Sequence, residues 1–180
     1  MKLIILDRDG VINHDSAQFI KSPEEWKPIP GSLDAIARLT EAGYRIIVAT
    51  NQSGVGRGLF DMDTLNAIHD KMLKAVSAVG GRIDAIFFCP HPAESTCECR
   101  KPKSGMFREI AERFNVDLTG VPTVGDSLRD LQAGIAVGCV PYLVLTGKSR
   151  KTAENPELPA GTRVAADLNA VANQLLGFKA

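Results

Sequence analysis

Short apolar runs alternate with helical periodicities along almost the whole chain. The apolar runs cover residues 3–6, 45–49, 83–88, 121–124 and 140–145, with a last short one near Val164. Between them, apolar residues recur with the spacing of a helix face over residues 32–42, 61–79, 106–114, 127–137 and 168–176. Strands alternating with helices predict an α/β fold: a Rossmann-like three-layer sandwich with a central parallel sheet. The stretch 146–162, rich in Pro, Lys and Glu, is expected to be a mobile surface loop.

The size of the chain fits one globular domain over residues 1–180. Of its 180 residues, 44% are hydrophobic, which is enough for a full core but little for two. The 21 basic and 21 acidic residues balance, so charge indicates neither a nucleic-acid partner nor a disordered acidic tail. No apolar stretch is long enough for a signal peptide or a membrane span. We therefore expect a cytoplasmic protein, a monomer, that binds neither nucleic acid nor membrane.

Polar side chains follow four of the predicted strands at the point where each strand ends. These segments are Asp7-Arg8-Asp9, Thr50-Asn51-Gln52-Ser53, Cys89-Pro90-His91 and Gly125-Asp126-Ser127. In folds of this class, ligands bind beyond the carboxyl ends of the strands. A single acidic residue after a strand usually only caps a turn, but four polar strand ends together indicate a functional site.

The acidic segments suit a magnesium-dependent phosphatase. Asp7 and Asp9 flank one residue, and two carboxylates so close repel each other unless a cation lies between them. Asp126 can add a third oxygen ligand, and oxygen donors with room for water and phosphate suit Mg²⁺. One carboxylate can attack phosphorus, while the other protonates the leaving alkoxide and then deprotonates water. Thr50, the backbone N–H groups near Asn51 and a lysine would hold the phosphoryl oxygens.

A second cluster has the composition of a metal site. Its four members are Cys89, His91, Cys97 and Cys99. Three thiolates and one imidazole make a closed tetrahedral set, which is typical of structural Zn²⁺. Zinc would fix a loop too long to fold on its own core and would aim Arg100 and Lys101 at the site. The alternative is a set of reduced, unpaired cysteines.

Taken in order along the chain, these motifs resemble those of the haloacid dehalogenase-like hydrolase superfamily. The family's DxDG(T/V) motif is present at residues 7–11, its second motif at the strand end Thr50, and its GDxxxD motif at residues 125–130. The resemblance implies that Asp7 is the nucleophile and Asp9 the acid and base. It also implies that the side chains of Asp7 and Asp126 and the backbone carbonyl of Asp9 bind Mg²⁺.

The family's third motif is a lysine, and the sequence offers two. Lys101 and Lys103 are both candidates, and the run Cys99-Arg100-Lys101-Pro102 looks like the family's form, which favours Lys101. The role of Asp130 stays open between supporting the site and capping a helix turn.

The sequence has no room for the substrate-selecting cap that many members carry. The segments between Asp9 and Thr50 and around the cysteines are both too short to hold a cap domain, so we expect a capless fold with a zinc-bound loop and an open site. Among capless members, the zinc set followed by Arg-Lys-Pro resembles a branch with two activities. One is D-glycero-D-manno-heptose 1,7-bisphosphate 7-phosphatase, which serves ADP-heptose and lipopolysaccharide core precursor synthesis, and the other is histidinol-phosphate phosphatase. Ser53 favours the heptose form; histidinol phosphate or another small-metabolite phosphomonoester is the alternative.

The resemblance also implies a set of substrate contacts. They are Asp15, Ser16, Ala17, Gln18, Asn51, Gln52, Ser53, Arg100 and Ser127. A second phosphate in the substrate would explain Arg100, because a guanidinium can clamp a phosphate bidentately. Ser127 departs from the pattern, since some heptose enzymes carry a lysine there. His14 is expected near the site with its role open, and His69 at the surface of the long helix.

Two readings from other classes are weaker. A phosphoacceptor receiver domain would need its aspartate after the third strand, where Cys89-Pro90-His91 stands. A zinc-dependent binding module without catalysis would explain the cysteines but not Asp7, Asp9 and Asp126. Turnover of a generic aryl phosphate separates both from an enzyme.

Overall fold

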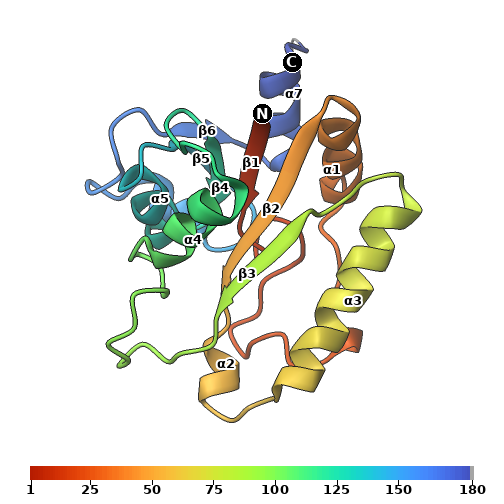
Figure 1. Ribbon diagram of the computed structural model, residues 1–180, viewed down its shortest axis with the longest axis vertical. Helices are drawn as coiled ribbons and strands as arrows, with labels where there is room; N and C mark the ends of the chain where they lie inside the picture. Colours follow the sequence, from red (N-terminus) through yellow and green to blue (C-terminus); the bar gives the residue numbers. More distant parts are fainter. Residues whose placement is uncertain (179–180) are drawn as a thin grey trace.

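The computed structural model describes residues 1–178, and it contains one parallel six-stranded sheet (Figure 1). The strands are β1 (Lys2–Leu6), β2 (Tyr44–Asn51), β3 (Ala85–Cys89), β4 (Pro122–Gly125), β5 (Val140–Val144) and β6 (Arg163–Ala165). Their order across the sheet is β3-β2-β1-β4-β5-β6. The direction of winding therefore reverses between β1 and β4, and the carboxyl ends of these two strands border the crevice where such folds bind ligands.

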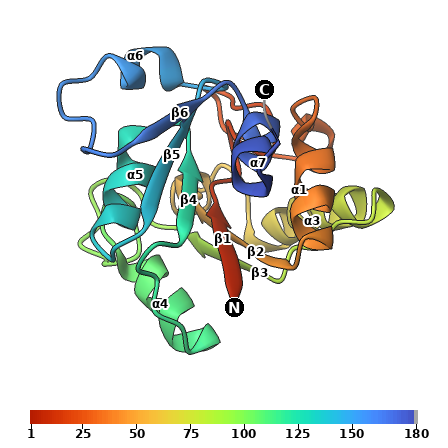
Figure 2. The same ribbon diagram turned by 90° about the horizontal axis from the view of Figure 1, so that it is seen from above.

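Helices cover both faces of the sheet, which confirms the predicted three-layer α/β architecture. The helices are α1 (Ser32–Glu41), α2 (Ser53–Gly56), α3 (Met62–Ala78), α4 (Gly105–Phe114), α5 (Leu128–Ile135), α6 (Ser149–Ala153) and α7 (Leu168–Leu176), with a 3₁₀ turn η1 (Pro23–Glu25). Seen from above, α1, α3 and α7 lie on one side of the sheet, and α4 and α5 lie on the other (Figure 2). None of the helices within residues 1–178 is both long and apolar enough to cross a membrane.

The core consists of two apolar clusters, one on each face of the sheet. Along β1, Ile4 and Leu6 pack with α1, α3 and α7, whereas Leu3 and Ile5 pack on the α4 side. Successive side chains of a strand point to opposite faces, so a strand covered on both faces must be apolar throughout. This is why β1 and its neighbours appear in the sequence as uninterrupted apolar runs that end where the polar site residues begin.

Helix ends follow local capping rules. Asp167 precedes α7, and its carboxylate accepts a hydrogen bond of 2.8 Å from the N–H of Ala170, which satisfies one of the free donors of the first turn. Gly177 ends the same helix in a left-handed conformation, with φ of 75°. The predicted bounds of this helix are therefore those observed. Other predicted elements agree within a few residues at each end.

Three elements were not predicted. α6 lies inside the stretch that we expected to be a loop throughout, and that expectation is wrong for Ser149–Ala153. α2 and η1 were also missed. All three are at most five residues long, so none carries the two turns of apolar spacing from which a helix is recognised in a sequence.

Candidate active site

A cavity of about 240 Å³ is lined by residues that follow β1, β2 and β4. Most of the predicted site residues line it: Asp7, Asp9, Asp15, Ser16, Ala17, Asn51, Gln52, Ser53, Arg100, Lys101, Asp126 and Ser127. Gln18 does not; it borders an adjoining hollow with His14. Thr50 is 1% exposed and lies behind the cavity wall. The parallel sheet thus brings together side chains that are more than a hundred residues apart in the sequence.

Lys101 is the cation at the bottom of this cavity. It is 2% exposed, and its ammonium group lies 3.0 Å from Asp7 Oδ1, forms an ion pair of 2.6 Å with Asp130 and donates to the carbonyl of Ala49 at 2.7 Å. Burial alone would lower the pKa of Lys101, but Asp130 and Asp7 raise it above its ordinary value. Lys103, the other candidate, is exposed and pairs with Glu98. The structure therefore places Lys101 in the site and leaves Lys103 outside it.

Asp7 is a carboxylate whose charged form is disfavoured by its surroundings. Burial raises its pKa well above the usual value, and the neighbouring charges of Asp130, Asp126 and Asp9 add to this effect, while Lys101 opposes it. One lysine does not balance several buried carboxylates, so this end of the sheet favours a further cation.

The carboxylates of Asp7, Asp126 and Asp130 can bring one oxygen each within 4.8 Å of one another. Asp126 is 3% exposed, and burial followed by the charge of Asp130 raises its pKa to about 7. Its Oδ2 accepts a hydrogen bond of 2.9 Å from the N–H of Lys148. Gly10, at φ of 84°, packs so closely that a Cβ there would meet the Asp126 carboxylate. The oxygen donors present fit a hard divalent cation such as Mg²⁺.

Asp130 both supports the site and caps a helix, the two roles that the sequence left open. Its Oδ1 pairs with Lys101, and its Oδ2 accepts from the Ser127 hydroxyl at 2.8 Å and from the Ser127 N–H at 3.1 Å, a capping box at the start of α5. The Ser127 hydroxyl proton is committed to this box. Ser127 therefore borders the cavity but does not offer its proton to a substrate in this arrangement.

The Asn51 side chain is likewise committed to the protein. Its amide donates to the carbonyl of Lys101 at 3.1 Å and accepts from the Lys101 N–H at 3.0 Å. This two-sided clamp ties the end of β2 to the loop that carries Lys101. Gln52 donates to Thr50 Oγ1 at 3.0 Å. Ser53, at the start of α2, also borders the cavity, and its side chain has no hydrogen-bond partner among residues 1–178.

Asp9 is held by a buried network around Arg8. Arg8 is fully buried and grips Asp9 through Nε to Oδ1 at 2.9 Å and Nη2 to Oδ2 at 3.1 Å. Asn13 and Gln52 donate to the same carboxylate at 2.9 Å and 3.1 Å. Burial would raise the pKa of Asp9, but the Arg8 charge and these hydrogen bonds outweigh it and hold the pKa below its usual value.

The expectation that His69 is a surface residue was wrong. It is 6% exposed, and its Nε2 lies 3.1 Å from Arg8 Nη1. Burial and the Arg8 charge lower its pKa to about 4. His69 shares a face of α3 with Leu65 and Met72, which the helical spacing could have revealed. The buried arginine that makes a histidine acceptable there could not be seen in the sequence.

Three cations that line the cavity were missed as site residues. Arg57 follows α2, Arg129 lies in the first turn of α5, and Lys148 follows β5. Arg57 and Arg129 are close enough to Arg100 that both lower its pKa, after the larger effect of burial. Arg100 Nη1 is buried and has no hydrogen-bond partner among the residues described. For Arg57 and Arg129 the available signal was a basic residue four and two positions beyond the polar segments 50–53 and 125–127; Lys148 follows a strand with an apolar end and had no such signal.

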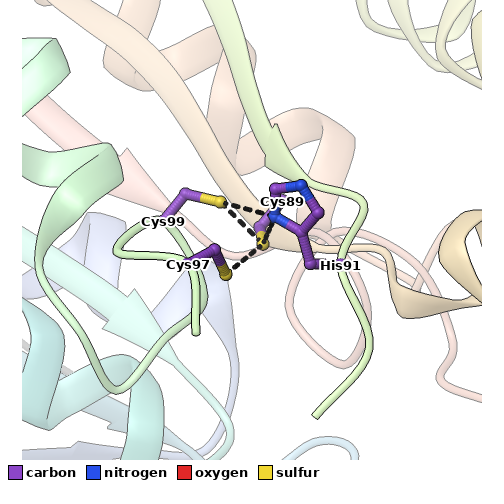
Figure 3. A group of neighbouring side chains, drawn as sticks. All are labelled: Cys89, His91, Cys97 and Cys99. Atoms are coloured by element: carbon purple, nitrogen blue, oxygen red, sulfur yellow. Dashed lines mark hydrogen bonds between the residues drawn. The ribbon is translucent and has the colours of Figure 1, made fainter. Parts of the chain in front are cut away.

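The four predicted metal ligands converge at the end of β3 (Figure 3). Cys89 Sγ lies 3.7 Å from Cys97 Sγ and 3.5 Å from His91 Nδ1, and His91 Nδ1 lies 3.3 Å from Cys99 Sγ. With zinc–sulfur bonds of about 2.3 Å and zinc–nitrogen bonds of about 2.0 Å, tetrahedral ligand atoms are about 3.8 Å apart for two sulfurs and about 3.5 Å apart for sulfur and nitrogen. Cys89 Sγ and Cys99 Sγ are closer together, at 2.8 Å, and would have to separate by about 1 Å to hold zinc between them. The donor set and its spacing fit a structural thiolate–imidazole metal site.

The fold and the acidic strand ends define a hydrolase of the haloacid dehalogenase-like class. A family model described as polynucleotide kinase 3 phosphatase matches residues 2–130, and one described as HAD-hydrolase-like matches residues 98–171. Membership of this class leaves no support for a receiver domain or a non-catalytic zinc module.

Within that class, the relatives point to one family. A D-glycero-β-D-manno-heptose-1,7-bisphosphate 7-phosphatase of Bordetella bronchiseptica is 64% identical over 98% of both chains, and that of Pseudomonas aeruginosa is 52% identical over 97% of both. The crystal structure of D,D-heptose 1,7-bisphosphate phosphatase from B. bronchiseptica, complexed with magnesium and phosphate, superimposes with a TM-score of 0.97 at 62% identity, covering 99% of this chain and 100% of that one. The chain belongs to the family of D-glycero-β-D-manno-heptose-1,7-bisphosphate 7-phosphatases.

Proposed function

We propose that this chain hydrolyses the 7-phosphate of D-glycero-D-manno-heptose 1,7-bisphosphate. The observation that carries the proposal is that one cavity holds the Asp7–Lys101 pair and is also lined by Arg57, Arg100 and Arg129. A monophosphate ester needs cations at the reacting centre only, whereas a bisphosphate needs a second cationic anchor. The names of the relatives that are 52–64% identical over nearly the whole chain support the same substrate.

The reaction proceeds in two steps at the end of β1. Asp7 attacks the phosphorus and forms an aspartyl-phosphate. Asp9, which has to release the hydrogen bonds on one oxygen and be protonated there, gives that proton to the leaving sugar oxygen. Asp9 then takes a proton from the water that hydrolyses the intermediate. Lys101 orients Asp7 and places its positive charge near the phosphoryl oxygens. Backbone N–H groups after Thr50 would donate hydrogen bonds to the same oxygens.

Magnesium fits this site as its cofactor. The carboxylates of Asp7 and Asp126 and the backbone carbonyl of Asp9 would hold it, with the N–H of Lys148 fixing Asp126 from the other side. When bound, Mg²⁺ would neutralise the phosphoryl oxygens and offset the repulsion among the buried carboxylates. Asp130 stays a partner of Lys101 in this assignment.

The second phosphate is held by the arginines. Arg100 has a buried guanidinium nitrogen with no partner among residues 1–178, and a phosphate oxygen would satisfy it. The Ser127 hydroxyl is not free to bind this phosphate, because it donates to Asp130, but Arg129, two residues further on, lines the same cavity. We therefore assign the anchoring of the distal phosphate to Arg100 with Arg57 and Arg129. The sugar would lie along Asp15, Ser16, Ala17 and Ser53, with Gln18 outside the cavity.

Zinc is the metal proposed for the cysteine cluster. Cys89 belongs to β3, and the other ligands lie in the loop that leads through Arg100 to Lys101. Binding would fix this loop and thereby the two cations that follow it. Elemental analysis of protein purified without chelator should find about one zinc per chain, and a Cys97→Ser variant should hold less. A zinc-free, fully stable protein would contradict the proposal.

The remaining assignments follow from the substrate. We propose that the chain is a single domain over residues 1–180, works as a monomer in the cytoplasm and contributes to ADP-heptose precursors of the lipopolysaccharide core. The names of the relatives support the substrate and, through it, this pathway.

The test compares kcat/KM for heptose 1,7-bisphosphate with that for histidinol phosphate and a simple aryl phosphate. We expect the bisphosphate to be preferred. Arg100→Ala should reduce kcat/KM for it by about tenfold to a hundredfold, the equivalent of a charged hydrogen bond, and should affect the aryl phosphate much less. Equal losses on both would mean that Arg100 serves the transferred phosphoryl group. Preference for histidinol phosphate would refute the substrate assignment.

A further inference from the structure

The carboxylate of Asp9 has every acceptor position filled. Oδ1 accepts from Arg8 Nε and Asn13 Nδ2, and Oδ2 accepts from Arg8 Nη2 and Gln52 Nε2. A carboxylate offers about four lone-pair sites, so none is left for a proton or a substrate in this arrangement. Asp9 nevertheless lines the cavity, with 21% of its side chain exposed. To act as an acid, it must give up bonds on one oxygen while the other stays held.

The guanidinium of Arg8 is held in place by several hydrogen bonds. Its Nε and Nη2 are used by Asp9, Nη2 also donates to Gln52 Oε1 at 3.2 Å, and Nη1 donates to His69 Nε2 at 3.1 Å. An arginine is always protonated and can only donate, so His69 must be neutral, with its proton on Nδ1. The imidazole also lies against Phe88, with the ring centres 6.3 Å apart. Helix α3 and strand β3 thus determine where the guanidinium sits.

We infer that Arg8, anchored by His69, is a positioning residue that aims Asp9 at the leaving-group oxygen. Arg8 Nε holds Oδ1 as a pivot, and a small rotation of the Asp9 carboxylate frees Oδ2 from both Arg8 Nη2 and Gln52 to face the cavity. His69 acts through Arg8 and touches neither Asp9 nor the cavity. The inference rests on the proposed phosphatase reaction, but not on which sugar is the substrate.

The way in which kcat/KM depends on the leaving group distinguishes a role of His69 in positioning Asp9 from a role in the stability of the fold alone. A general acid accelerates loss of a poor leaving group and does little for a good one. The constant to measure is kcat/KM, because it covers the steps up to formation of the phosphoenzyme and excludes the later base step. A series of aryl phosphates from 2,4-dinitrophenyl to unsubstituted phenyl phosphate supplies the range.

The decisive variants are His69→Leu, which removes the acceptor, and His69→Gln, which can restore one through its side-chain oxygen. We expect His69→Leu to lose about tenfold in kcat/KM on phenyl phosphate and less than twofold on the dinitrophenyl ester, within the range of general acid catalysis. His69→Gln should recover most of the loss. Met72→Ala, a cavity variant one turn along α3, should destabilise the fold and leave the leaving-group dependence unchanged.

Other outcomes would overturn the inference. Equal losses of His69→Leu on all esters, or a dependence that Met72→Ala shares, would mean that His69 is structural only. A gain on phenyl phosphate would mean that the Arg8 network withholds Asp9 and does not aim it. Unaltered kinetics would mean that the anchor is dispensable. Absence of turnover of any ester by the wild-type chain would instead defeat the proposed function itself.

Discussion

Replacing Lys101 by methionine tests whether the buried ion-pair network is organised as described. The change keeps a long flexible side chain but removes the charge that contacts Asp7, Asp130 and the carbonyl of Ala49. The three side chains of the network are only 3%, 12% and 5% exposed, so solvent cannot replace the lost partner. Breaking a buried pair from one side costs about 3–5 kcal/mol. With a urea slope of about 2 kcal/mol/M, the unfolding midpoint should fall by about 1.5–2.5 M.

Urea unfolding followed by fluorescence provides the assay, because the single tryptophan, Trp26, is 1% exposed. The measurements are made without added Mg²⁺, so that this cation does not compensate for the lost lysine, and without chelator, so that the cysteine cluster keeps its metal. Adding Asp130→Asn to the Lys101 variant should recover about 1–3 kcal/mol, because one of the stranded charges is removed. Lys103→Met is the matched control and should change stability by less than about 1 kcal/mol. Equal effects of the two lysine variants would refute the reasoning.

Three further outcomes follow from single residues. Gly10→Ala should abolish activity and weaken Mg²⁺ binding, because the added Cβ would displace Asp126. Gly43 has a similar φ but open space around it, so Gly43→Ala should lose only about 1 kcal/mol of stability and keep its activity. Equal activities of the two variants would count against this. Asp167→Ala should lower the free energy of unfolding by about 1 kcal/mol without altering kinetics, as thermal melts can check. Because His69 has its pKa lowered to about 4 from about 6.5, wild-type stability should fall by up to ~3 kcal/mol as pH drops through that window. His69→Gln should lose less, and an identical pH profile would contradict the buried neutral state.

The strand ends were predictable because a parallel sheet leaves little choice. Once β1, β2 and β4 were recognised from their apolar runs, Asp7, Asn51 and Asp126 had to meet at one edge of the sheet. The sequence also indicated the four members of the cysteine cluster from their residue types and their closeness along the chain, and the fold brings them together.

What the sequence could not reveal depends on contacts across the fold. Asn51 and Ser127 were expected to touch substrate, but the first clamps the backbone of Lys101 and the second caps α5 through Asp130. Both are polar residues beside a site, and only the partner distinguishes a ligand contact from a structural one. Arg8 was overlooked because a charged residue between two aspartates is normally expected to be solvated. In the structure it is fully buried.

Asp7 is expected to carry the phosphoryl group during turnover, and a single-turnover experiment can find it there. The enzyme is mixed with substrate labelled in the 7-phosphate, and the mixture is quenched in acid within milliseconds and digested. We expect transient label on the N-terminal peptide that contains Asp7, and neither label nor turnover in Asp7→Asn with the fold intact. Turnover by Asp7→Asn at the wild-type rate, or label on a peptide that lacks Asp7, would contradict it.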